Sequence, residues 1–150
     1  MENYSDMKIL LVDDEERFRK TLNKRLREKG FDAADVESGI KALEYLKKSS
    51  VDVMVLDIKM PEMDGIETLL NVKKVSPGTE VVLLTGHGTV DTAIQGMRAG
   101  AHDYLMKPCE IELLIDKIER AYDVKKERDE RIKKAEERSR LDKLEKAVRF

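Results

Sequence analysis

This chain of 150 residues has only one cysteine, no long apolar run and no large excess of charge of either sign. Its single cysteine, Cys109, cannot form a disulfide within the chain, which fits a reducing cytosol. No apolar run approaches the roughly 20 residues that a membrane span requires, and the start, MENYSDMK, lacks the features of a signal peptide. These absences predict a soluble, cytoplasmic protein that does not associate with membranes.

Opposite charges nearly cancel, because 29 Lys and Arg face 31 Asp and Glu for a net charge of -2. This balance gives no electrostatic reason to expect nucleic-acid binding. The chain has no G-x-x-x-x-G-K-[ST] or G-x-G-x-x-G motif, no helix-turn-helix pattern and no cluster of His and Cys. We therefore expect neither ATP hydrolysis nor direct DNA binding from these residues, whose 41% hydrophobic content suffices for one domain core.

Short apolar segments alternate with helical patterns along the chain. The predicted strands are 7–12, 31–36, 51–56, 80–84 and 101–106, and the helices begin after 16, at 38, at about 64, at 89 and at 110. This (βα)5 pattern predicts an α/β fold, a parallel sheet covered by helices on both faces through right-handed crossovers.

The third apolar segment is followed directly by a lone acid, Asp57, and then by a loop with Pro61 and Gly65. A short strand of this kind, bounded by turn formers and flanked by helices, is typical of the interior of a parallel sheet. Ligands of such sheets bind at the carboxyl ends of the strands, so Asp57 lies where a reactive carboxylate is useful.

Four of the five predicted strands end in a polar group, and the residues concerned are Asp13, Asp14, Asp57, Thr85 and Lys107. Each alone is ordinary as a helix cap, a turn residue or a surface lysine. Together, three carboxylates repel unless a proton or a cation neutralises them, and oxygen ligands favour Mg2+ over Zn2+. Such a site suits phosphoryl chemistry, with Asp57 as nucleophile, Lys107 offsetting charge and Thr85 donating a hydrogen bond.

These residues carry a family resemblance over about residues 6–122. The acidic pair, the Asp57 strand with MPEMDG, Thr85-Gly86, and DYL before Lys107-Pro108 resemble the receiver domain of bacterial two-component response regulators. The stretch TGHGTVDTAIQGMRAGAHDYLMKP is most similar to receivers of sigma-54-dependent, NtrC-type activators. The resemblance implies a flavodoxin-like doubly wound parallel sheet in the order 2-1-3-4-5.

The resemblance also implies a signalling domain rather than an enzyme, which accepts a phosphoryl group on Asp57 from a sensor histidine kinase. Asp14, Asp57 and the Lys59 backbone carbonyl would bind Mg2+ directly, and Asp13 through water. Thr85 and Lys107 would hold the phosphoryl oxygens, with a cis bond between Lys107 and Pro108.

Thr85 and Tyr104 would form the switch of such a receiver, although a plain edge aromatic is the alternative for Tyr104. His87 and Lys59 match positions that tune the lifetime of the phosphoryl group, with exposed loop side chains as the other reading. We interpret His102 as an ordinary strand residue and Cys109 as structural.

The composition becomes more highly charged from Glu110 onward, and we predict a receiver domain over 1–122 and a helical extension over 123–150. Residues 125–131, KKERDER, are all charged and have no apolar face to bury in a core. An imperfect apolar stripe resumes from Ile132 to Val148, so the extension is either a coiled-coil partner helix in a homodimer or a solvated, partly frayed tail. The chain is accordingly a single-domain regulator or the receiver and linker of a longer activator, the second being favoured.

Three other readings start from the same residues. A phosphatase of the haloacid dehalogenase type needs a second Asp two residues after the nucleophile, where this chain has Lys59. A flavin or nucleotide carrier needs backbone donors after the first strand, whereas DDEE repels phosphate. A pure dimerisation module with a decayed site is disfavoured because all five polar strand-end residues are present.

Overall fold

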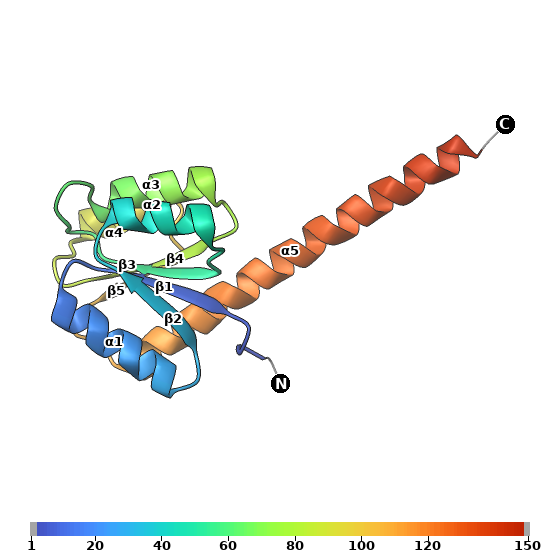
Figure 1. The fold of residues 1–150 in the computed structure, drawn as a ribbon. Coiled ribbons are helices and arrows are strands. Elements are labelled where there is room, and N and C mark those ends of the chain that lie inside the picture. The colour runs from blue at the N-terminus through green and yellow to red at the C-terminus, as the bar shows by residue number, and fades with distance from the viewer. Residues whose placement is uncertain (1–2, 149–150) are drawn as a thin grey trace.

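The computed structural model describes residues 3–148, which form a parallel sheet with helices on both of its faces (Figure 1). In chain order the elements are β1 (Lys8–Val12), α1 (Glu16–Glu28), β2 (Asp32–Val36), α2 (Gly39–Lys48), β3 (Val53–Leu56), α3 (Gly65–Val75), β4 (Glu80–Thr85), α4 (Val90–Arg98), β5 (Asp103–Met106) and α5 (Ile111–Ala147). Every strand pair is parallel, and the order β2-β1-β3-β4-β5 confirms the predicted topology.

Element ends differ from the predictions by a few residues. The strand predicted from Ala101 begins at Asp103, so His102, predicted as a strand residue, lies just before β5. His102 still donates its backbone N–H to the Val81 carbonyl at 2.7 Å. The ladder starts where Val82 pairs with Asp103, and this register depends on a neighbouring strand rather than on local composition.

The three central strands, β1, β3 and β4, are almost entirely buried on both faces, which explains their nearly continuous apolar sequences. On one face, Leu11 and Val55 belong to a core cluster with the inner sides of α1 and α5. On the other, Leu10 and Met54 pack with α2 and α3, beside which α4 lies (Figure 1). Side chains alternate in this way because successive residues of a strand point to opposite faces.

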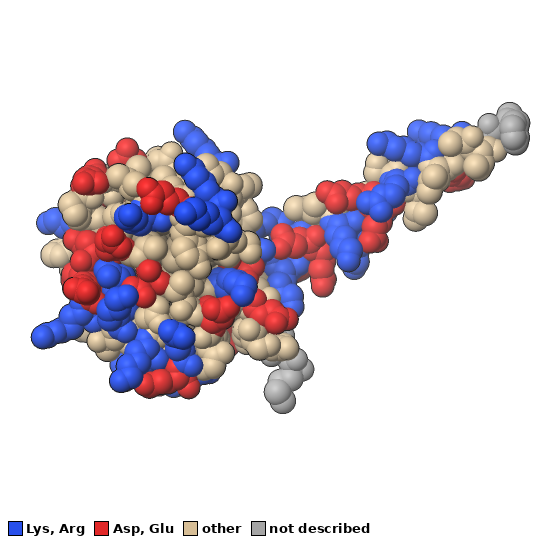
Figure 2. Space-filling model, viewed as in Figure 1, with Lys and Arg blue, Asp and Glu red and all other residues tan. Residues whose placement is uncertain are grey.

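Helix α5 begins as part of the domain and continues as a single extended helix (Figure 1). Its buried residues, Leu114, Ile118, Ala121 and Tyr122, all fall in the first third of the helix. Beyond them, acidic and basic side chains are mixed along the exposed part, as Figure 2 shows. Within residues 3–148, no helix combines the length and the apolar character that crossing a bilayer requires.

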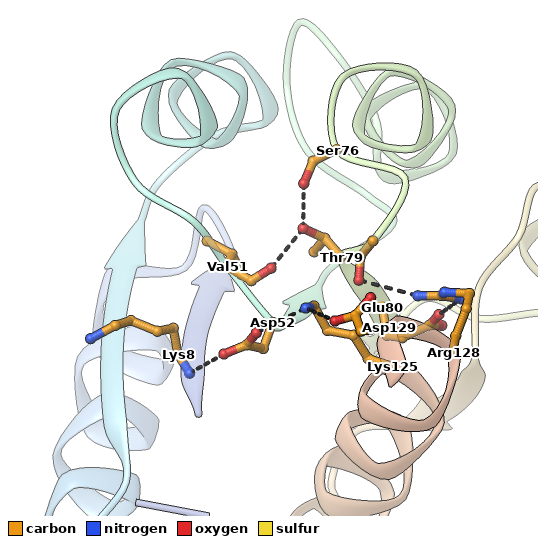
Figure 3. A network of polar contacts seen from close by, with 10 residues as sticks. Lys8, Val51, Asp52, Ser76, Thr79, Glu80, Lys125, Arg128 and Asp129 are labelled. Carbon is orange, nitrogen blue, oxygen red and sulfur yellow. Dashed lines mark hydrogen bonds and ion pairs between the residues drawn. The ribbon is translucent and has the colours of Figure 1, made fainter. Parts of the chain in front are cut away.

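The charged segment 125–131 is anchored to the domain, which its lack of apolar residues did not indicate. Lys125 lies 3.2 Å from the carboxylate of Asp52, which precedes β3, and Arg128 donates to Glu80 of β4 at 2.7 Å (Figure 3). A second Arg128 nitrogen donates to the Gly78 carbonyl at 3.3 Å. We call Asp52, Glu80, Lys125 and Arg128 the basal network, because they lie at the amino ends of the strands.

Candidate functional site

Three aspartates meet at the carboxyl edge of the sheet. Asp13 and Asp14 follow β1, and Asp57 follows β3, the neighbouring strand. One carboxylate oxygen from each lies within 4.8 Å of the other two, with Asp13 and Asp57 buried and Asp14 exposed. The parallel arrangement of adjacent strands brings these acids together, as the sequence predicted.

Asp57 is 2% exposed, and its backbone N–H donates to the Val12 carbonyl at 3.0 Å. Among buried side-chain polar atoms of residues 3–148, its Oδ1 alone has no hydrogen-bond partner. Burial, which disfavours the charged form, and repulsion by Asp13 raise the pKa of Asp57 above the ordinary carboxyl value. The Thr85 hydroxyl and the Lys107 ammonium oppose this rise in pKa without cancelling it. The carboxylate therefore lacks a partner that a cation or a donor would supply.

Lys107 reaches the acids from the end of β5. Its ammonium lies 2.6 Å from Asp13, 3.8 Å from Asp57 and 3.9 Å from Glu15, and its side chain is 11% exposed. The bond between Lys107 and Pro108 is cis, as expected. The Lys107 ammonium is thus held between several carboxylates, and its distance of 3.8 Å from Asp57 is to Oδ2, not to the unpartnered Oδ1.

Thr85 ends β4 and is fully buried. Its Oγ1 accepts the backbone N–H of His87 at 3.1 Å, which fixes the hydroxyl at the site edge. His87 lies in the following loop with an exposed side chain. Lys59, in the loop after β3, also has an exposed side chain, and its carbonyl stays a predicted ligand.

Tyr104 in β5 is half-buried, and its hydroxyl lies 3.2 Å from the Thr92 hydroxyl of α4. Thr92 also closes a capping box with Thr89 at the start of α4. A side chain at Gly88 would overlap the Tyr104 hydroxyl, so the loop before α4 and the ring are closely packed. The contact between Tyr104 and Thr92 could not be predicted from the sequence, because it joins a strand and a helix whose relative placement no local pattern indicates.

The comparison with protein families decides what this arrangement is. The family described as response regulator receiver domain matches residues 9–119. The chain belongs to the response regulator receiver family. The predicted family is thereby confirmed, and so is its kinship with NtrC-type sigma-54 activators.

Individual relatives agree with this assignment. The transcriptional regulatory protein ZraR of Klebsiella oxytoca is 40% identical over 106 residues, which cover 71% of this chain and 24% of the relative. A CheY-like receiver from Methanospirillum hungatei JF-1 has a TM-score of 0.78 and 26% identity, covering 81% of this chain and 98% of that one. NtrX from Brucella abortus, solved with ADP, has a TM-score of 0.77 and 32% identity, covering 82% of this chain and 28% of that one.

The receiver chain spans about a quarter of the length of the curated relatives it matches, between 24% and 27%. The similarity therefore concerns the receiver part of those relatives. Receiver domains bind Mg2+ at an acidic cluster of aspartates, and this receiver has such a cluster in Asp13, Asp14 and Asp57. Its all-oxygen ligand set and the unpartnered Asp57 oxygen fit a hard divalent cation.

Two residues outside the acidic cluster, Arg19 and Gly65, contact the backbone of the residues that form it. Arg19 in α1 donates to the Asp13 carbonyl at 2.8 Å and to Asp35 at 2.6 Å. Burial favours a raised pKa for Asp35, but hydrogen bonds from Arg19 and Lys20 leave that pKa below its ordinary value. A methyl group at Gly65 would overlap the Asp57 carbonyl, so α3 begins directly against the end of β3, where Asp57 lies.

Proposed function

We propose that Asp57 is the phosphoacceptor of this receiver and that a sensor histidine kinase supplies the phosphoryl group. The observation that carries the proposal is the buried Asp57 carboxylate, with one unpartnered oxygen, among two other aspartates and a lysine. An Asp57 oxygen forms a bond to phosphorus as the bond from phosphorus to the kinase histidine nitrogen breaks. The histidine nitrogen keeps the electron pair, and the product on this chain is an acyl phosphate.

Asp14 and Asp57 would hold Mg2+ directly with the Lys59 carbonyl, and Asp13 would hold it through water. The ion supplies charge neutralisation at the oxygens of the transferring group. A cation held there would favour the carboxylate and so oppose the rise in the pKa of Asp57 that burial causes.

Lys107 and Thr85 would bind the other phosphoryl oxygens. The Lys107 ammonium already lies 3.8 Å from Asp57, so a small displacement from Asp13 brings it to an oxygen on phosphorus. Thr85 keeps its hydroxyl proton available for donation while its oxygen accepts from His87. Thr85 and Tyr104 together form the proposed switch, since movement of Thr85 toward the new group vacates space for the aromatic ring.

The proposed output is self-association in the cytoplasm, through the receiver and the α5 extension, within a longer sigma-54-type activator. Exposed apolar side chains on α4, β5 and α5 support this part, and they include Val90, Ile94, Met97, Met106 and Leu113. Phosphorylation acts only by favouring one of two arrangements, so it changes how two receivers pack. A single-domain regulator that acts on a partner protein is the second candidate, because the same exposed face suits a heterologous contact.

A Mg2+-dependent phosphatase remains the enzymatic alternative. It needs an acid two residues beyond Asp57, and this chain has the exposed Lys59 there. The receiver reading requires no such acid, since hydrolysis is not its output.

Incubation with acetyl phosphate and Mg2+, followed by intact mass measurement, tests the phosphoacceptor. We expect one added phosphoryl group in the wild-type chain and none in Asp57→Ala. Sedimentation with Mg2+, with and without beryllofluoride, tests the output in the same two proteins. Phosphorylation of Asp57→Ala, or none in the wild type, would rule out the proposed acceptor.

A further inference from the structure

The Lys107 ammonium has an aromatic ring on one side and acids on the others. Its Nζ lies 4.0 Å from the centroid of the Phe18 ring, a distance at which the ring face attracts a cation. Asp13, Asp57 and Glu15 lie within 3.9 Å of the same nitrogen. Phe18 is thus the uncharged member of the group of side chains that surrounds Lys107.

Phe18 is well placed to hold a fixed position. It lies in the first turn of α1, four residues after Asp14, and its half-buried ring packs against the core cluster between α1 and α5. Together with Asp13 and Asp57, it lines a small cavity beneath the site. Arg19, the next residue, anchors the same turn to the Asp13 carbonyl at 2.8 Å.

The Phe18 ring and the surrounding carboxylates attract the Lys107 ammonium by different interactions. Lysine has a flexible stem and three donors, so its ammonium can turn toward the exposed Glu15 as readily as toward Asp57. An aromatic face attracts the charge without accepting a strong hydrogen bond, so the three N–H groups stay available for oxygens.

We infer that Phe18 is a positioning residue for Lys107, whose ring keeps the ammonium within reach of oxygens bound at Asp57. The inference rests on the proposed role of Lys107 at the phosphoryl group. The observed contact of the Phe18 ring is with the lysine, so its inferred effect on the site passes through Lys107.

The test compares Phe18→Leu, which keeps an apolar side chain but no ring face, with Phe18→Tyr, which keeps the face. Beryllofluoride binding in Mg2+ should weaken roughly threefold to tenfold in Phe18→Leu and recover in Phe18→Tyr. In NMR spectra, the ε-methylene protons of Lys107 should show the upfield shift of a ring face in the wild type and Phe18→Tyr. Phe18→Leu should lose that shift.

Phe31→Leu is the matched control, since Phe31 packs against the same core cluster away from Lys107. It should lower stability without changing the Lys107 signal. In a Lys107→Ala background, Phe18→Leu should cause no further loss of beryllofluoride affinity, because coupled residues are not additive. Equal losses in both backgrounds, or an unshifted Lys107 signal in the wild type, would overturn the inference. Failure of the wild type to bind beryllofluoride would instead contradict the proposed function, while the NMR comparison would still decide the role of Phe18.

Discussion

At Asp57 the fold holds a carboxylate where its charged form is disfavoured. The residue is 2% exposed, one oxygen has no partner among the described residues, and Asp13 adds repulsion. A buried carboxylate of this kind favours binding a cation or forming a covalent bond, because either event removes the unfavourable free energy of its unpaired charge. Burial of the Asp57 charge therefore lowers the free energy of unfolding, and Asp57 is the residue that the proposed chemistry uses.

The pH dependence of stability should reveal this cost. Because the pKa of Asp57 is raised in the folded state, the folded chain binds more protons than the unfolded chain above the ordinary value of 3.8. Without Mg2+, the contribution of Asp57 to the free energy of unfolding should fall as pH rises from that value through its raised pKa. Urea titrations across this range should show the fall in the wild type relative to Asp57→Asn. Parallel curves for the two proteins would contradict the raised pKa.

Mg2+ should offset the destabilisation caused by the buried Asp57 charge, because its positive charge would lie next to the carboxylate. We expect added Mg2+ to raise the thermal midpoint of the wild type and to leave Asp57→Asn almost unchanged, by linkage between binding and folding. Differential scanning calorimetry with matched ionic strength, using NaCl, provides the measurement and its control. A rise of equal size in both proteins would place the ion elsewhere.

The close approach of α3 to Asp57 depends on the lack of a Cβ atom at Gly65. The first residue of α3 lies against the Asp57 carbonyl, and its N–H donates to the Ile58 carbonyl at 2.6 Å. Gly65→Ala should lower the free energy of unfolding by about 1–3 kcal/mol, the usual cost of overpacking. Urea unfolding measures the loss, and Gly78→Ala is the control, since a methyl there would meet only the Lys125 Cε at 4.0 Å. Equal effects of the two substitutions would contradict the steric account.

At the scale of elements, α5 is held by apolar contacts along its first third and by the basal network thereafter. Glu80 is a buried acid with two cations, Arg128 at 2.7 Å and Lys73 at 4.0 Å. Burial lowers the pKa of Lys73, and the Arg128 charge lowers it further, although Glu80 opposes both. The buried carboxylate thus fixes the turn of α5 that carries Arg128, because leaving it without cations is costly.

Arg128→Gln should therefore loosen this turn of the helix. Lys73 remains near Glu80, and Arg128 is partly exposed, so we expect a loss of about 1–2 kcal/mol in local stability. Hydrogen exchange of the amides in residues 123–131 should become faster while the strands stay protected. Arg131→Gln is the control, since Arg131 forms an exposed pair with Glu127 at 4.0 Å. Unchanged exchange in Arg128→Gln would show that the network does not hold the helix.

At the scale of the whole molecule, α5 extends away from the domain (Figure 1), and this extension has exposed apolar side chains. Leu141, Leu144 and Val148 are exposed and share one face, since they are spaced three and four residues apart. If the chain dimerises as proposed, replacing Leu141 and Leu144 with Ser should weaken self-association at least tenfold, because each buried leucine contributes roughly 1.5–3 kcal/mol. Sedimentation equilibrium measures this, with Lys143→Ser on another face as the control. An unchanged association constant would exclude this stripe from the dimer.

The sequence by itself determined the fold class, the strand order through the family resemblance, and the residues at the strand ends. Strands buried on both faces need unbroken apolar runs, and the acids, Thr85 and Lys107 stand out because they interrupt that pattern. Helix caps such as Ser38, which accepts from the Lys41 N–H at 3.1 Å, are equally local signals. Each of these features depends on residues close together in the chain.

Only the tertiary structure decided which partners those residues meet. The contacts of Phe18 with Lys107, of Thr92 with Tyr104 and of Arg128 with Glu80 join segments far apart in the sequence. Their distances depend on strand register, helix placement and side-chain packing, which no local pattern encodes. The all-charged segment 125–131 is the clearest case. Its composition indicated a solvent-exposed turn of helix, whereas in the structure its Arg128 pairs with the buried carboxylate of Glu80 at the amino end of β4.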